Sequence, residues 1–130
     1  MYLNLLIMSR LQNRVILIGY VGNDPEMHSF ASGDKKATFR LATNRYSKDA
    51  KGDSVEETDW HTVVVYGRLT EVVENFVHKG RRIGIEGRIS YRSYSAQDGT
   101  KRFFTEIVCD ELELLGTGQG KNIPAMEESL

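Results

Sequence analysis

The chain has 130 residues, and its 17 lysine and arginine residues nearly balance its 18 aspartate and glutamate residues, so its net charge is −1. This length predicts one domain with a single core, and the charge balance excludes an overall basic character, so any binding of nucleic acid depends on where the charges lie. One cysteine, Cys109, excludes an intrachain disulfide framework and a cysteine metal cluster, and we expect no cofactor or metal.

The N-terminal residues 1–8, MYLNLLIM, are apolar but too short for a membrane span, which needs about 20 apolar residues. They lack the basic start and the cleavage site of a signal peptide. Because the polar stretch SRLQNR follows Met8, we expect residues 1–8 to be an extension and Met8 an alternative start. We expect no association with membranes.

Two strands are predicted before residue 47. Residues 13–22, NRVILIGYVG, are apolar on both faces and end in the turn cluster GNDP. In residues 36–46, KATFRLATNRY, Phe39 and Leu41 alternate with Arg40 and Tyr46, so these pairs point to opposite faces.

Residues 47–57, SKDAKGDSVEE, contain almost no apolar side chains and predict a long mobile loop. Residues 58–68, TDWHTVVVYGR, predict the third strand because of their valines. Trp60 and Tyr66 are an even number of residues apart and share one face, while Val63 and Val65 face the core and Val64 breaks the alternation.

The second half of the chain changes from period two to a helical period and back. Residues 81–94 and 100–116 predict two strands joined by the hairpin loop AQDG, with a break near Asp110, and residues 117–130 predict a short disordered tail. Before them, residues 68–80 predict an amphipathic helix that Gly80 ends. The apolar stripe of this helix comprises Leu69, Val72, Val73, Phe76 and Val77.

Five strands with one helix between the third and the fourth are typical of an all-β fold, the OB-fold, which is a five-stranded Greek-key barrel. Residues 9–116 would form this domain. The periodicity alone also permits another small α+β domain.

The alternation places arginine and aromatic side chains together on the solvent face. Aromatic rings stack on nucleobases of any sequence, and arginine pairs with phosphates or stacks through its planar guanidinium, so this mixture suits single-stranded nucleic acid. Each residue also has an ordinary explanation, such as a buried tryptophan or a solubilising arginine, and the hypothesis depends on their occurrence on one face of three strands. These side chains are Arg40, Tyr46, Trp60, Tyr66, Arg88, Arg92 and Tyr94.

An enzyme is disfavoured by the motifs. The three histidines are scattered, and no Walker loop, His-x-x-x-His pair or Gly-x-Ser-x-Gly elbow occurs. We therefore expect a protein that binds without catalysis.

Five segments together are distinctive: NRVILIGYVGNDPE, FRLATNRY, TDWHTVVVYGRLTEVVENFVHKG, IEGRI and QDGTKRFFTEIV. They resemble the bacterial single-stranded DNA-binding protein family, which is also found in mitochondria, and the similarity runs from about Ser9 to Gly116. The resemblance implies an OB-fold homotetramer that coats and protects single-stranded DNA in replication, repair and recombination, here in a bacterial cytoplasm with the nucleoid.

The resemblance also implies roles for individual residues. Stacking positions carry over to Trp60, Tyr66, Tyr94 and Tyr46, phosphate contacts to Arg14, Arg68, Arg92, Arg10, Arg40 and Arg88, and a subunit contact to His61. The family's acidic tail tip with a terminal phenylalanine is missing, since this chain ends MEESL, so recruitment of replication and repair proteins is left open.

Three other functions stay open. The alternatives of the same class are an OB-fold protein for RNA and a primosome accessory protein. The alternative of another class is an OB-fold used only for protein assembly.

Overall fold

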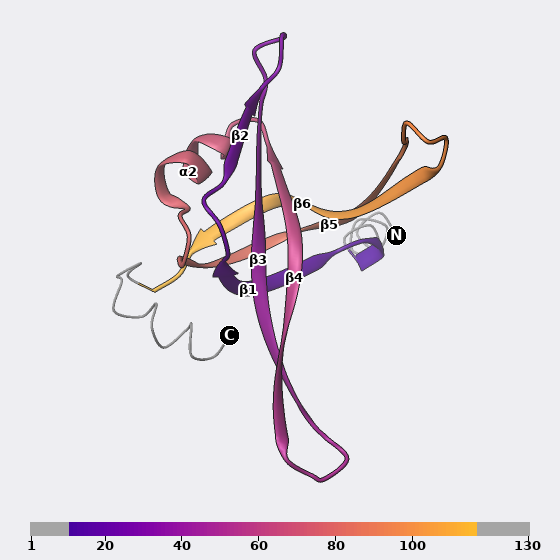
Figure 1. Ribbon diagram of the computed structural model, residues 1–130. Coiled ribbons are helices and arrows are strands. Elements are labelled where there is room, and N and C mark those ends of the chain that lie inside the picture. Colours follow the sequence, from indigo (N-terminus) through magenta and orange to yellow (C-terminus); the bar gives the residue numbers. More distant parts are fainter. Residues whose placement is uncertain (1–10, 117–130) are drawn as a thin grey trace, which may run out of the picture.

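The computed structural model describes residues 11–116, which include six strands and, between the fourth and fifth strands, helix α2 (Figure 1). The predicted extension 1–8 and tail 117–130 lie outside the described residues. The elements are β1 (Val15–Val21), β2 (Glu26–Ser29), β3 (Lys35–Lys48), β4 (Ser54–Tyr66), α2 (Leu69–Phe76), β5 (Arg82–Ser95) and β6 (Lys101–Leu114).

Five of these strands close into a barrel. They follow one another in the order β1-β5-β6-β4-β3, and β3 pairs again with β1 at Leu41 and Ala42. All pairings are antiparallel except β4 with β6, where Val63–Val65 lie beside Ile107–Cys109 in parallel. The predicted five-stranded barrel with one helix is therefore confirmed.

The short strand β2 was not predicted. It pairs with residues 35–38 at the start of β3, outside the barrel. All four of its residues are exposed, so they carry no apolar alternation from which a strand can be predicted.

The barrel core comes from the inward faces of the strands, as the alternation predicts. Phe39, Leu41, Val63 and Val65 are completely buried in one apolar cluster, and each fully buried side chain of this size stabilises the fold by about 1.5–3 kcal/mol. Val64 points outward but is also buried, because it lies in the middle of the sheet between β3 and β6.

Helix α2 packs against β3, β4 and β6, and it is shorter than predicted. Val73 and Val77 are completely buried, with Val77 just past the last helical turn. Phe76, which was predicted to belong to the same apolar stripe, is 50% exposed, and the small Thr70 is buried instead. Its hydroxyl donates a hydrogen bond to the carbonyl of Gly67, so a polar residue fills a position that hydrophobicity alone would not select.

Two long hairpins extend beyond the barrel (Figure 1). The β3–β4 pairing continues to Lys48 and Ser54, and the β5–β6 pairing continues to Ser95 and Lys101. We call the outer part of the first hairpin, residues 44–58, the polar arm, and that of the second, residues 91–105, the aromatic arm. The predicted loop at 47–57 is therefore wrong, since only residues 49–53 lie between the strands.

The aromatic arm ends where the sequence predicts its turn. The amide of Ala96 donates a hydrogen bond to the carbonyl of Thr100, and Gly99 has a φ of +85°, which suits glycine. The predicted break near Asp110 is a bulge, because Glu86 pairs with Glu111 and Gly87 pairs with Cys109.

Candidate nucleic-acid interface

Alternate residues of β3, β4, β5 and β6 point away from the core and form one surface, which we call the outer face. Cross-strand neighbours in a sheet point to the same side, so the pairings Ala42–Trp60, Val64–Val108 and Arg92–Phe104 define this face across all four strands. Seven of the ten proposed binding residues belong to these strands, and all seven are on this face: Arg40, Tyr46, Trp60, Tyr66, Arg88, Arg92 and Tyr94.

Trp60 lies on the outer face of the barrel and not in its core. Its side chain is 45% exposed. The ring rests against Gly22, where a Cβ atom would collide with it, and the guanidinium carbon of Arg40 lies 4.6 Å from the ring centroid. The glycine and the arginine therefore hold the indole in one orientation while leaving part of it open to solvent.

Tyr66 and Tyr94 continue this aromatic surface toward the aromatic arm. Tyr66 is 48% exposed at the end of β4, and Tyr94 is 51% exposed on β5. The ring of Tyr94 is stacked on that of Phe104, with centroids 5.3 Å apart and planes inclined by 12°. Tyr46 is more exposed but stands apart on the polar arm, opposite Glu56.

The proposed phosphate-binding arginines fall into two groups. The side chains of Arg40, Arg68 and Arg88 form no ion pair with any described residue, so their charges are available to a ligand. Arg14, just before β1, is paired with Glu86, and Arg92 is paired with Glu106. Arg10 lies outside the described residues.

The pair of Arg92 and Glu106 has a bidentate geometry. The Nε atom of Arg92 lies 2.6 Å from Oε1 of Glu106, and Nη2 lies 3.3 Å from Oε2. The hydrogen bond and the negative charge of Glu106 raise the pKa of Arg92. Glu106 is only 7% exposed, so it is a buried acidic residue on the same face as the arginines.

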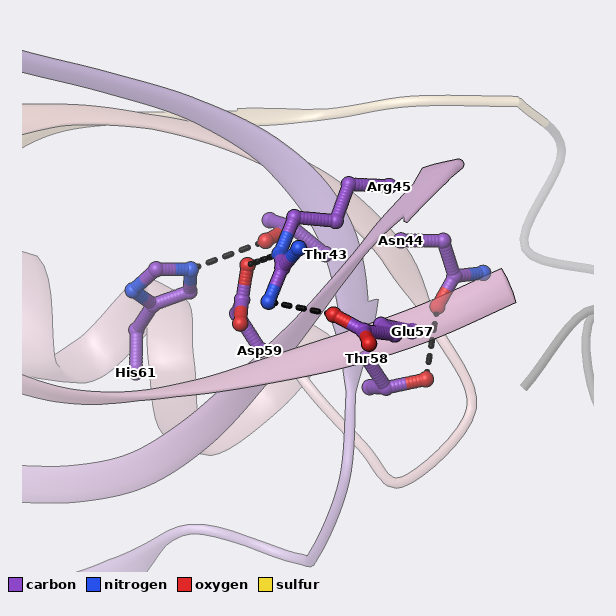
Figure 2. A network of polar contacts seen from close by, with 7 residues as sticks. All are labelled: Thr43, Asn44, Arg45, Glu57, Thr58, Asp59 and His61. Carbon is purple, nitrogen blue, oxygen red and sulfur yellow. Dashed lines mark hydrogen bonds and ion pairs between the residues drawn. The ribbon is translucent and has the colours of Figure 1, made fainter. Parts of the chain in front are cut away.

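His61 points away from the outer face and is part of a polar network on the other side of the β3–β4 hairpin (Figure 2). Its Nε2 atom lies 2.9 Å from the hydroxyl of Thr43. Farther out, the guanidinium of Arg45 bridges Asp59 and Glu57, and these carboxylates raise its pKa. The network links β3 to β4 and leaves His61 half-buried beside a hydroxyl.

The other reactive groups of the described chain have structural surroundings. Cys109 is buried, burial raises the pKa of its thiol to about 11, and the thiol donates a hydrogen bond to the carbonyl of Glu111. Within residues 11–116, no group of three or more His, Cys, Asp or Glu side chains is placed to hold a metal ion. None of the helices among these residues is long and apolar enough to cross a membrane.

Two residues of this surface, Phe104 and Glu106, were missed from the sequence. A count of pairs outward from a four-residue AQDG loop would place residue 103 opposite Arg92, but the last pair is Ser95 with Lys101, so the observed register places Phe104 opposite Arg92 and diagonal to Tyr94. Glu106 follows two residues later on the same face. Nothing in the sequence shows that its carboxylate is buried.

Known proteins are similar to this chain in sequence. A family model described as the single-strand binding protein family matches residues 12–115. Single-stranded DNA-binding protein 1 of Chlorobaculum tepidum is 43% identical over 110 residues, which are 84% of this chain and 68% of that protein. The single-stranded DNA-binding protein of Bacteroides thetaiotaomicron is 44% identical in an alignment of 124 positions, which covers 90% of this chain and 77% of that protein.

A solved structure is also similar. The structure titled Plasmodium falciparum SSB complex with ssDNA superposes with a TM-score of 0.75 at 34% sequence identity, covering 80% of this chain and 95% of that chain. The similarity therefore extends over most of this chain.

Proposed function

From the premise that the chain belongs to the single-strand binding protein family, we propose that it binds single-stranded DNA on its outer face without reading the base sequence. The observation that carries this proposal is the half-exposure of Trp60, Tyr66 and Tyr94 on one face among arginines. Each ring that stacks on a base contributes roughly 1–3 kcal/mol, and every base offers a π-face.

Within this function, we assign different duties to the two groups of arginines. Arg40, Arg68 and Arg88 neutralise phosphates, since no described carboxylate is paired with them. Arg14 and Arg92 bind phosphates with the donors that Glu86 and Glu106 leave free. Arg10, which lies outside the described residues, is a further phosphate contact that the family resemblance implies. Tyr46 supplies a separate stacking position on the polar arm.

The cellular role that we propose is to coat and protect single-stranded DNA during replication, repair and recombination in a bacterial cytoplasm, without catalysis. We also propose a homotetramer in which His61 lies at a subunit contact. The exposure of Ile16 and Ile18 on β1, at 63% and 54%, supports self-association, because adjacent exposed aliphatic side chains favour burial against another surface.

A titration of the full chain with oligo(dT), followed by the emission of Trp60, tests the proposal. We expect quenching, because the indole is the one tryptophan of the chain and a base would stack on it. The affinity should fall as salt rises, because phosphate contacts release counterions.

The same titration separates the alternatives. Matched RNA that competes as well as oligo(dT) would favour an RNA-binding or primosome accessory protein. Emission that stays unchanged at saturating oligo(dT), with no complex in a sedimentation experiment, would contradict binding and favour a protein-assembly module.

A further inference from the structure

The rings of Tyr94 and Phe104 are stacked on one another on the outer face. The two side chains are diagonal neighbours across β5 and β6, since Tyr94 pairs with Arg102 and Phe104 pairs with Arg92. Both rings stay substantially open to solvent, at 51% and 43%. The aromatic arm therefore presents two rings at one place, in a fixed mutual orientation.

A half-exposed phenylalanine has no polar group that hydrogen-bonds to water, so its exposure does not stabilise the free protein. A single exposed apolar residue is common on protein surfaces and needs no explanation. Phe104 differs because it is held in a defined position by two neighbours, the ring of Tyr94 and the guanidinium of Arg92, whose carbon lies 5.5 Å from its centroid. Such a ring is ready to accept a flat ligand without first losing rotational freedom.

The position of Arg92 is in turn fixed by Glu106. A buried carboxylate needs a partner, and the bidentate contact with Arg92 supplies it. The contacts thus run from Glu106 through Arg92 and Phe104 to Tyr94.

We propose that Phe104 stacks on a nucleobase together with Tyr94, and that Glu106 is a positioning residue that holds Arg92 beside the Phe104 ring. The proposal rests on the proposed function, and it adds Phe104 to Tyr94 as a second ring of the aromatic arm that stacks on an unpaired base of single-stranded DNA. In this arrangement the cation of Arg92 acts mainly on the aromatic ring, with phosphate contact as a secondary role.

Phe103 offers a matched control, because it is the next residue on the same strand, is 77% exposed and points to the opposite side of the arm. The variants Phe104→Ala, Phe104→Leu and Phe103→Ala are compared with the wild-type full chain by oligo(dT) titration, with thermal unfolding as a check of folding. Phe104→Leu keeps an apolar side chain without a π-face, and therefore tests stacking even if the alanine variant folds poorly.

We expect both Phe104 variants to bind at least about fivefold more weakly, the lower end of one lost base stack, and Phe103→Ala to bind as the wild type does. Wild-type affinity in Phe104→Leu, or an equal loss in Phe103→Ala, would overturn the role of Phe104. If the wild type itself does not bind oligo(dT), the proposed function fails as well, so the two failures are distinguishable.

A double-mutant cycle tests the role of Glu106. If this residue acts through Phe104, Glu106→Gln weakens oligo(dT) binding in the wild type and causes no further loss in the Phe104→Leu background. A purely structural Glu106 would cause the same loss in both backgrounds, and that result would overturn its role as a positioning residue.

Discussion

The two arms have the same backbone construction and different side-chain chemistry. Each is an antiparallel hairpin that continues past the other strands of the barrel (Figure 1). The polar arm is held by Arg45 between Glu57 and Asp59 and by a hydrogen bond from Thr58 to Asn44 (Figure 2). The aromatic arm carries four exposed rings, those of Tyr91, Tyr94, Phe103 and Phe104.

This difference indicates that a paired hairpin does not by itself make a binding site. Charged side chains that pair with one another leave few free groups for a flat ligand, whereas stacked aromatic rings keep one face open to solvent. Salt screens the interactions of the polar arm, because they are exposed charges, and affects ring stacking much less. Substitutions in the two arms should therefore have different consequences.

The largest expected effect is a difference in the loss of oligo(dT) affinity between substitutions of the tyrosines in the two arms. Tyr94→Ala should weaken oligo(dT) binding by about 1–3 kcal/mol, because it removes a ring already stacked on Phe104, and Tyr46→Ala should cost about 1 kcal/mol or less. Fluorescence titration of both variants at one salt concentration measures the difference. An equal or larger loss in Tyr46→Ala would show that the polar arm contributes as much to binding as the aromatic arm.

A smaller effect concerns the ion pairs of the polar arm. Arg45→Met removes the cation between Glu57 and Asp59, so the two carboxylates repel one another. We expect faster amide hydrogen exchange at Val55 in low salt and almost no difference in 1 M salt, where the Debye length is about 3 Å.

Arg88→Met is the control for this experiment, because Arg88 forms no ion pair with a described residue. Its exchange at Val55 should equal that of the wild type. Faster exchange in Arg45→Met that persists in 1 M salt would exclude the ion pairs as the cause.

The smallest expected effect is at the tip of the aromatic arm. Asp98 accepts hydrogen bonds from the hydroxyl and the amide of Thr100, and these bonds lower its pKa below the ordinary 3.8. A lowered pKa means that the stabilisation of the turn is present above pH 3.8 and is lost as pH falls through the lower folded value.

An NMR titration of the Asp98 carboxyl group measures this value. Thr100→Val removes the hydroxyl donor and should move the pKa of Asp98 back toward 3.8. An unchanged titration in that variant would contradict the hydrogen bond as the main cause.

Much of the barrel could be predicted from the alternation of apolar and polar residues, because its strands have one buried face and one solvent-exposed face. The alternation at Phe39, Leu41, Val63 and Val65 placed the core correctly, and the same alternation put Trp60 on the outside. The long loop at 47–57 was predicted wrongly because both faces of the polar arm meet water. A strand that is exposed to solvent on both faces shows no alternation of apolar and polar residues, so the sequence pattern does not predict its pairing.

By itself, the amino-acid sequence determined the barrel, its inward face and the outward direction of the stacking candidates, because period-two burial is a local property of each strand. Only the tertiary structure decided which outward residues meet: Arg92 with Glu106, Arg40 with Trp60, and Tyr94 with Phe104. These contacts depend on cross-strand register, twist and burial, through which residues far apart in the chain become neighbours.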